Sequence, residues 1–320
     1  MSKATVHAIA VLLVASLFCS SYLASVQAQE AGSLPKLPAP PKDHWLNIPD
    51  TNLPKLWGSV MGVLGPYDKT QKCWILKAES RFFCLRPAKY ARAEVKDSTK
   101  HMFAITGIEL ERDRKGFTNA LKGAPDGGAV VFLSLDQSTT NPAKSLKLTT
   151  IDGIYELGSI GYPPSDDDFA LVSLGGDIYA WAVTSHGNGA GGEMASSTNL
   201  IVATGIPNLK GRNILSFLSA RNNSGGCGSE MRIVCTEEHV RFRIVPSAKT
   251  PRNIELTYDE TVGNEQTFII FNTSTRNTAP PLTIRFEESK SGYPIPVKHG
   301  ATIMEWFSAL RTRSYSNPNR

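Results

Sequence analysis

The sequence predicts a mainly β protein with antiparallel sandwich- or barrel-like sheets built from hairpins, and a short C-terminal helix. Short runs rich in Ile, Phe, Thr and Val recur along the chain, and Pro, Gly and Asn separate them at roughly 8–12-residue spacing, as in β-sandwiches and barrels. Asp152-Gly153 and Gly175-Gly176 each lie between two such runs, as hairpin turns do. Near the end of the chain, Thr302 and Glu305 fit a helix-capping box.

The N-terminal segment, residues 1–28, has the features of a secretory signal peptide. Lys3 supplies a basic start, residues 9–18 form an apolar run, and Val26 and Ala28 occupy the small-residue positions before a cleavage site. The polar residues that follow the apolar run end it well before the roughly 20 residues of a membrane span. We therefore expect cleavage after Ala28, a secreted or periplasmic location, and no transmembrane segment in the mature chain.

Composition argues against nucleic-acid binding and against bulk disorder. The formal net charge is +5, of which Lys3 in the signal segment supplies one, and the basic residues are scattered. A nucleic-acid surface would need them clustered. With 41% hydrophobic and 20% charged residues, the chain has enough apolar content for a folded core. We expect no nucleic-acid partner and no cofactor, and the expected partner is an unidentified envelope or extracellular ligand.

The mature chain divides into a tether and two predicted lobes. Residues 29–43 are rich in proline, which lacks the N–H that ladders and helices need, so we expect an extended tether. A β lobe is expected over residues 44–221. The loop-like sequence RNNSGGCG at 221–228 marks the boundary. Residues 229–320 then form a smaller C-terminal β lobe with the terminal helix.

Three hairpins are predicted from short turns between strand-length runs. CWILKA and RFFCL, over residues 73–85, flank Glu79-Ser80. Asp152-Gly153 separates residues 145–151 from 154–160, and Asp-Gly supplies the positive φ angles of a type I′ turn. Gly175-Gly176 separates residues 168–174 from 177–185. Further strand-length runs are found at 101–110, 129–135, 199–204, 213–220, 232–245, 253–258, 266–272 and 282–287.

The strand at residues 177–185 is expected to be covered on both sides. Tyr179, Trp181 and Val183 fall on one face, and Ile178, Ala180 and Ala182 fall on the other. Alternation with neither face polar is typical of a strand buried between two layers.

The four cysteines of the mature chain predict two disulfides. Four cysteines allow three pairings, and proximity favours Cys73 with Cys84 and Cys227 with Cys235. The alternative is a zinc site, but neither pair has CxxC spacing, so we expect no metal. Loss of either disulfide should cost about 2–4 kcal/mol of stability.

Helix is expected mainly at the C-terminus. Behind the Thr302–Glu305 capping box, Ile303, Met304, Phe307 and Leu310 form one apolar stripe. Elsewhere, the polar segment at 111–126 predicts a loop or at most a brief helix.

The segment from Tyr162 to Glu193 gathers the candidate functional residues. Its acidic and polar side chains are the expected binding set: Asp166, Asp167, Asp168, His186, Asn188 and Glu193. If the Gly175-Gly176 hairpin holds its register, Asp168 and the loop after Ser185 meet at one exposed end of the sheet. A solvated acidic turn and a surface histidine without a role are the alternative interpretations.

His186 is the candidate catalytic residue, as a general base oriented by Asp168 or Asp177. No nucleophile is marked, because the G-x-S-x-G elbow is absent. Residues 187–192 match G-x-G-x-x-G in letters only, since no helix-forming sequence follows them. Two functions therefore remain open. The first is a non-enzymatic binding or cell-envelope interaction protein that recognises a glycan or extended peptide through Gly/Asn-rich loops. The alternative is a secreted hydrolase that uses His186 with Asp168 or Asp177.

Overall fold

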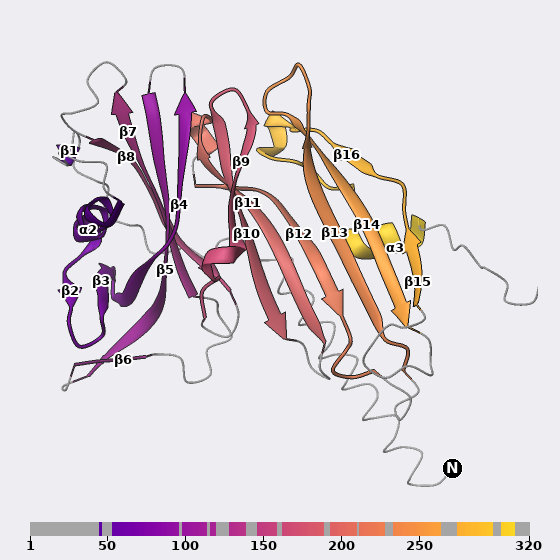
Figure 1. Ribbon diagram of the computed structural model, residues 1–320, viewed down its shortest axis with the longest axis horizontal. Helices are drawn as coiled ribbons and strands as arrows, with labels where there is room; N and C mark the ends of the chain where they lie inside the picture. Colours follow the sequence, from indigo (N-terminus) through magenta and orange to yellow (C-terminus); the bar gives the residue numbers. More distant parts are fainter. Residues whose placement is uncertain are drawn as a thin grey trace, which may run out of the picture.

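The protein is described from a computed structural model that covers residues 45–46, 53–95, 98–113, 116–119, 128–138, 146–158, 162–188, 193–209, 211–227, 233–263, 274–296 and 302–310. Within these ranges the chain is mainly antiparallel β, with two curled sheets and two short α-helices (Figure 1). The predicted fold class is confirmed. The expected signal peptide, tether and 266–272 strand lie outside the described residues.

The first sheet contains the N-terminal strands. They are β1 (Trp45–Leu46), β2 (Tyr67–Asp68), β3 (Cys73–Ala78), β4 (Arg81–Val95), β5 (Ser98–Asp113), β6 (Gly116–Asn119), β7 (Gly128–Ser138) and β8 (Leu146–Leu157). Their order is β1-β8-β7-β5-β4-β3-β2, and β6 pairs with β5. One face of this sheet is covered by helix α2 (Leu53–Leu64), which packs against Phe83, Leu85 and Phe103.

Helix α2 was not expected from the sequence. Pro54 stands in its first turn, where proline is tolerated, and Gly58 and Gly62 lower its intrinsic propensity. The helical signal lies in the spacing of its buried residues: Leu56, Val60, Met61 and Leu64. Packing of this apolar stripe on the sheet outweighs the weak propensity. The prediction that helix occurs mainly at the C-terminus is therefore wrong.

The second sheet contains the C-terminal strands. They are β9 (Phe169–Gly175), β10 (Ile178–Asn188), β11 (Met194–Thr204), β12 (Asn213–Asn222), β13 (Thr236–Val245), β14 (Asn253–Gly263), β15 (Ser274–Thr278) and β16 (Leu282–Ile284). Their order is β15-β14-β13-β12-β11-β10-β9, and β16 pairs with β14. Short 3-10 helices are η1 (Asp166–Asp168), η3 (Pro207–Leu209) and η4 (Glu288–Lys290). Helix α3 (Ile303–Leu310) follows, and its residues Ile303, Met304 and Phe307 are buried against the sheet.

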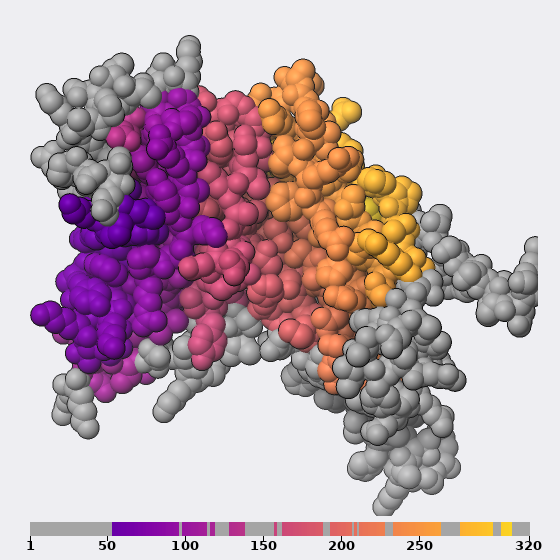
Figure 2. Space-filling model, viewed as in Figure 1, coloured from indigo at the N-terminus to yellow at the C-terminus, as the bar shows by residue number. Residues whose placement is uncertain are grey.

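The two sheets pack back to back, and each carries its helix on the outer face. Phe132 of the first sheet contacts Phe169 and Trp181 of the second, and the rings of Phe132 and Trp181 are stacked with centroids 6.0 Å apart. Ala180 and Ala182, which alternate with Trp181 along β10, belong to the cluster under α3. The predicted burial of this strand on both faces is confirmed. The layers run α2, first sheet, second sheet, α3, and the chain colours run from indigo to yellow across the molecule in Figures 1 and 2.

Two of the three predicted hairpins are present. Ala78 pairs with Arg81 across Glu79-Ser80, and β9 and β10 are joined next to Gly175 and Gly176, both of which have positive φ. The third prediction is wrong, because β8 runs without a break through Asp152-Gly153.

Asp152-Gly153 forms a bulge instead of a turn. Leu133 of β7 pairs with Ile151, whereas Val131 pairs with Ile154, so β8 holds one residue more than β7 between these pairs. A bulge accommodates such an extra residue within a continuous ladder. The long, continuous pairing with β7 therefore overrides the local turn preference of Asp-Gly.

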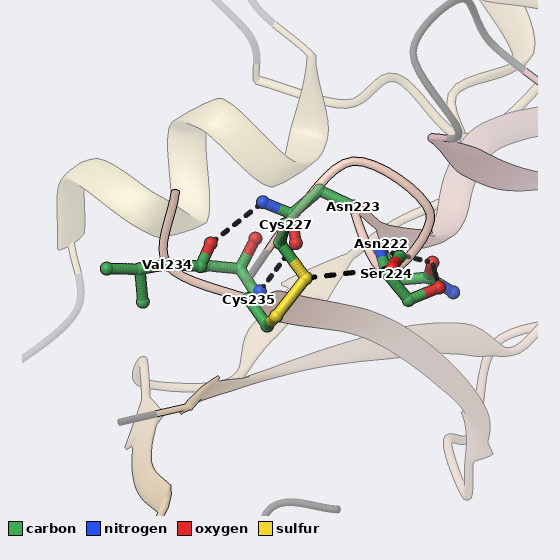
Figure 3. The surroundings of a disulfide bond; sticks show 7 residues. Asn222, Asn223, Ser224, Cys227, Val234 and Cys235 are labelled. Atoms are coloured by element: carbon green, nitrogen blue, oxygen red, sulfur yellow. Dashed lines mark hydrogen bonds between the residues drawn. A yellow bond between two sulfur atoms is a disulfide. The ribbon is translucent and has the colours of Figure 1, made fainter. Parts of the chain in front are cut away.

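Both predicted disulfides are present. Cys73–Cys84 joins β3 and β4 within a small apolar cluster. Cys227–Cys235 closes the connection between β12 and β13 (Figure 3). There the Asn223 side chain donates to the Val234 carbonyl at 2.9 Å and accepts from the Thr236 N–H at 2.7 Å. These bonds and the disulfide join the two ends of the connection.

The sheets divide the chain at a different place from the predicted lobes. The first sheet ends at Leu157 and the second begins at Phe169. The segment that begins at Arg221 joins β12 and β13, which are neighbours in one sheet with Ala220 opposite His239. The lobes 44–221 and 229–320 stay a prediction about folding units, and their boundary falls inside the second sheet.

Candidate functional site

Three polar side chains meet at one end of the second sheet: Asp168, His186 and Ser196. Asp168 ends η1, one residue before Phe169, which pairs with Val183 of β10. His186 lies three residues beyond Val183 on β10 and is the direct partner of Ser196 on β11. Two consecutive strand pairings, β9–β10 and β10–β11, therefore position the three side chains (Figure 1). We call this group the Asp168–His186–Ser196 cluster.

The cluster is a continuous chain of hydrogen bonds centred on the imidazole. His186 Nε2 lies 2.7 Å from Asp168 Oδ1, and His186 Nδ1 lies 2.8 Å from Ser196 Oγ. The other carboxylate oxygen of Asp168 accepts from the backbone N–H and the hydroxyl of Ser165, each at 2.7 Å. These two bonds from Ser165 fix the orientation of the Asp168 carboxylate, which in turn orients the imidazole ring.

Burial differs across the cluster. The His186 side chain is 58% exposed, whereas that of Asp168 is 13% exposed. His186 is therefore the exposed member of the pair, and Asp168 is largely covered. Partial burial by itself raises the pKa of Asp168, but the hydrogen bonds from Ser165 and His186 outweigh it and hold this pKa below its usual value. Asp168 is therefore a carboxylate at neutral pH.

These contacts define the roles of the two ring nitrogens. A carboxylate only accepts, so with a neutral ring the Nε2–H donates to Asp168 and the Nδ1 lone pair accepts from the Ser196 hydroxyl. A base that accepts the proton of a hydroxyl while a carboxylate orients it is the arrangement that activates a nucleophile. The exposed imidazole of His186 can also form hydrogen bonds with a polar ligand.

The cluster lies on the face of the sheet that α3 covers, beyond the apolar core. Ala180 and Ala182 of β10 belong to that core, and alternation along the strand places Thr184 and His186 on the same face. The hydroxyls of Thr184 and Thr198 lie 3.4 Å apart in the next cross-strand pair. The face therefore changes from apolar through hydroxyl-bearing to ionisable side chains along β10.

The remaining predicted site residues have different positions. Asp166 and Asp167 are exposed in η1, and Glu193 is exposed immediately before β11. Asn188 pairs with Met194 at the end of β10, and its side chain is outside the described part of the structure. Asp177 precedes β10, so it lies nine residues from His186, about 30 Å along an extended strand. The structure brings Asp168 to His186 and leaves Asp177 at the opposite end.

Ser196 was not among the predicted residues. It stands in a run of small polar residues, Ala195-Ser196-Ser197-Thr198, where nothing distinguishes one hydroxyl from the next. The available signal was the glycine-rich segment 187–192. If that segment is read as the tip of a hairpin, the strands on either side of it pair, but symmetry about 187–192 places His186 opposite Glu193. The observed partner, Ser196, lies three residues further along.

Two other described histidines have other surroundings. His101 is buried in the first sheet between the Tyr90 hydroxyl and the Gln137 side chain. His239 contacts Glu237 on β13, at 2.9 Å. Among the described residues, no group of three or more His, Cys, Asp or Glu side chains could hold a metal ion.

Comparison of the chain with protein-family models, with curated proteins and with solved structures finds no match. No helix in the described part of the chain is long and apolar enough to span a membrane.

Proposed function

We propose that the protein is an exported binding protein, secreted or periplasmic, and that it recognises a glycan or an extended peptide at the end of the second sheet that carries the Asp168–His186–Ser196 cluster. The observation that carries the proposal is the exposed, hydrogen-bonded imidazole of His186, held by a partly buried carboxylate. An exposed polar group whose orientation is already fixed loses little entropy when a ligand binds.

The surroundings of the cluster support recognition of a ligand with both polar and apolar surfaces. Tyr162 is 63% exposed and stands three residues before Ser165, which holds Asp168. Met194 is 51% exposed at the start of β11, two residues before Ser196. Aromatic rings and methionine provide apolar contact area beside hydrogen-bonding groups, as sugars and peptides require.

Export is the second part of this proposal. The two disulfides are consistent with an oxidising compartment, and residues 1–28 carry the signal-peptide pattern. N-terminal sequencing of the protein recovered outside the cytoplasm should begin at Gln29. A mature product that begins at Met1 would contradict the proposed export.

A glycan and peptide array tests the proposed recognition. We expect the mature protein to bind a subset of the array and His186→Ala to weaken that binding at least tenfold. His186 is largely exposed, so its replacement should change stability by no more than about 0.5 kcal/mol. The matched control is Arg243→Ala, an exposed side chain on β13 of the same sheet, and it should bind as the wild type does. Equal binding by all three proteins would reject this end of the sheet as the binding face.

A further inference from the structure

We propose that Ser196 is an acyl-transfer nucleophile, with His186 as its general base and Asp168 as the positioning residue, and that the substrate is an ester of a small acyl group on a hydrophilic carrier. This inference rests on the proposed functional face. It differs from that proposal in assigning a reaction to the cluster, and the experiment below separates the two.

The geometry meets two requirements of a serine nucleophile. The hydroxyl lies within hydrogen-bond reach of its base, at 2.8 Å, and the base lies 2.7 Å from an orienting carboxylate. The pairing of β10 with β11 holds the first contact, because His186 and Ser196 are direct partners in the ladder. Ser165 holds the second contact by fixing Asp168 from the other side. Strand pairing therefore holds the Ser196–His186 contact, and the turn at Ser165 holds the His186–Asp168 contact.

The reaction follows from the proton positions. Ser196 Oγ attacks the ester carbonyl carbon, a C–O bond forms, and the hydroxyl proton moves to His186 Nδ1. The Asp168 carboxylate stabilises the resulting imidazolium. Collapse of the tetrahedral intermediate breaks the bond to the leaving alcohol, which takes the proton from Nδ1. A water molecule then attacks the acyl-serine with Nδ1 again as base, and this step releases the carboxylic acid and restores Ser196.

The surroundings of Ser196 select the substrate class. His186 is 58% exposed, so a large carrier can approach the cluster. The next cross-strand pair on the same face consists of the Thr184 and Thr198 hydroxyls. Thr198 is already buried and Thr184 is half-buried. A long acyl chain laid along this face would cover Thr184 before it reached the apolar core, and the loss of the remaining hydration of that hydroxyl costs free energy. A short acyl group, such as the acetyl ester of an O-acetylated polysaccharide, avoids that loss.

The test uses the mature protein with a fluorophosphonate probe, followed by peptide mapping, and with p-nitrophenyl acetate and acetylated polysaccharide as substrates. We expect the probe on Ser196 and acetate release from the polysaccharide. Ser196→Ala and His186→Ala should each lower the rate at least 100-fold. Ser197→Ala is the matched control, because the neighbouring serine points to the opposite side of β11, and it should keep the wild-type rate.

Asp168 is tested as a positioning residue by the separation of kcat from KM. Asp168→Asn should lower kcat and leave KM for p-nitrophenyl acetate unchanged, since the carboxylate orients the ring and does not touch the substrate.

Thermal unfolding of each variant checks that it is folded. If the folded wild type is labelled no more than Ser196→Ala, or Ser197→Ala loses as much activity, the inference is wrong. Array binding that depends on His186 without any labelling of Ser196 would overturn the acyl-transfer inference and leave the recognition proposal intact. Labelling of Ser196 without array binding would support the acyl-transfer inference and reject the recognition proposal.

Discussion

His101 is buried in the first sheet with both ring nitrogens hydrogen-bonded. The Tyr90 hydroxyl lies 2.8 Å from Nδ1, and the Gln137 side-chain oxygen lies 3.0 Å from Nε2. Because the amide oxygen can only accept, the Nε2–H donates to it, and in the neutral ring Nδ1 accepts from the Tyr90 hydroxyl. Burial is the main reason that the pKa of His101 lies below the ordinary value of 6.5.

This depressed pKa predicts a loss of stability in mild acid. Below pH 6.5 the unfolded chain binds a proton at His101 that the folded protein does not, so stability is fully present above that pH and falls as the pH decreases toward the folded-state pKa. The slope for one such group is at most about 1.4 kcal/mol per pH unit. Urea unfolding at pH 7.5 and 5.5 measures it. His101→Gln, which keeps hydrogen-bonding capacity without titrating, should lose less stability over this interval. An equal loss in both proteins would assign the effect to other groups.

At the residue scale, the sequence indicates the candidate residues better than it indicates which side chains they contact. The candidate residues Asp168 and His186 are in contact, and both cysteine pairs are correct. Ser196 escaped detection because its contact with His186 depends on the register between β10 and β11, which the glycine-rich sequence between them does not specify. A short loop brings its two cysteines together whatever the wider fold. A cross-strand contact can be predicted only when the register of the two strands is known to within one residue.

At the scale of elements, α3 begins with the predicted capping box. The Thr302 hydroxyl accepts from the Glu305 N–H at 3.1 Å, and the Glu305 carboxylate accepts from the Thr302 N–H at 2.6 Å. Thr302→Ala removes the first of these bonds and should lower the free energy of unfolding by about 1 kcal/mol. Thr302→Ser keeps the hydroxyl and should stay close to the wild type. Chemical denaturation of the three proteins measures the difference, and equal midpoints for all of them would show that the cap does not contribute.

The elements differ in how fully local sequence determines them. The capping box and the turn at Gly175-Gly176 use residues suited to their own backbone, and they were predictable. The hairpin at Glu79-Ser80 was predictable from the short gap between two strand-length runs, although Glu79 has a positive φ that favours glycine. Asp152-Gly153 suits a turn equally well, but pairing with β7 continues on both sides of it and makes it a bulge. Helix α2 shows the opposite case, because Gly58 and Gly62 weaken a helix that packing on the sheet nevertheless stabilises. In both failures, tertiary contacts outweigh local preference.

For the whole molecule, Trp181 is the central contact between the two sheets. Its side chain is 1% exposed, stacks on Phe132 of the first sheet and meets Phe169 edge-on. Trp181→Ala should lower stability by about 3–5 kcal/mol, whereas Trp181→Phe should keep much of the contact. If the sheets stabilise each other, circular dichroism and fluorescence should report one shared transition at lower denaturant. Two separate transitions, only one of them shifted, would show that the sheets unfold independently.

The order of the two helices along the chain has a consequence for biosynthesis. Helix α2 precedes every strand of its sheet except β1, so the first sheet and its cover have both emerged from the ribosome once Leu157 has left it. Helix α3 follows its sheet, so the face that carries Tyr258, whose ring stacks on Phe307 of the helix, lacks that cover until α3 emerges. A nascent chain that stops after residue 296 would present that face to other proteins. Such a chain should pellet or remain bound to chaperones, and its yield in the supernatant, compared with that of the full chain, measures how strongly the last helix protects the second sheet.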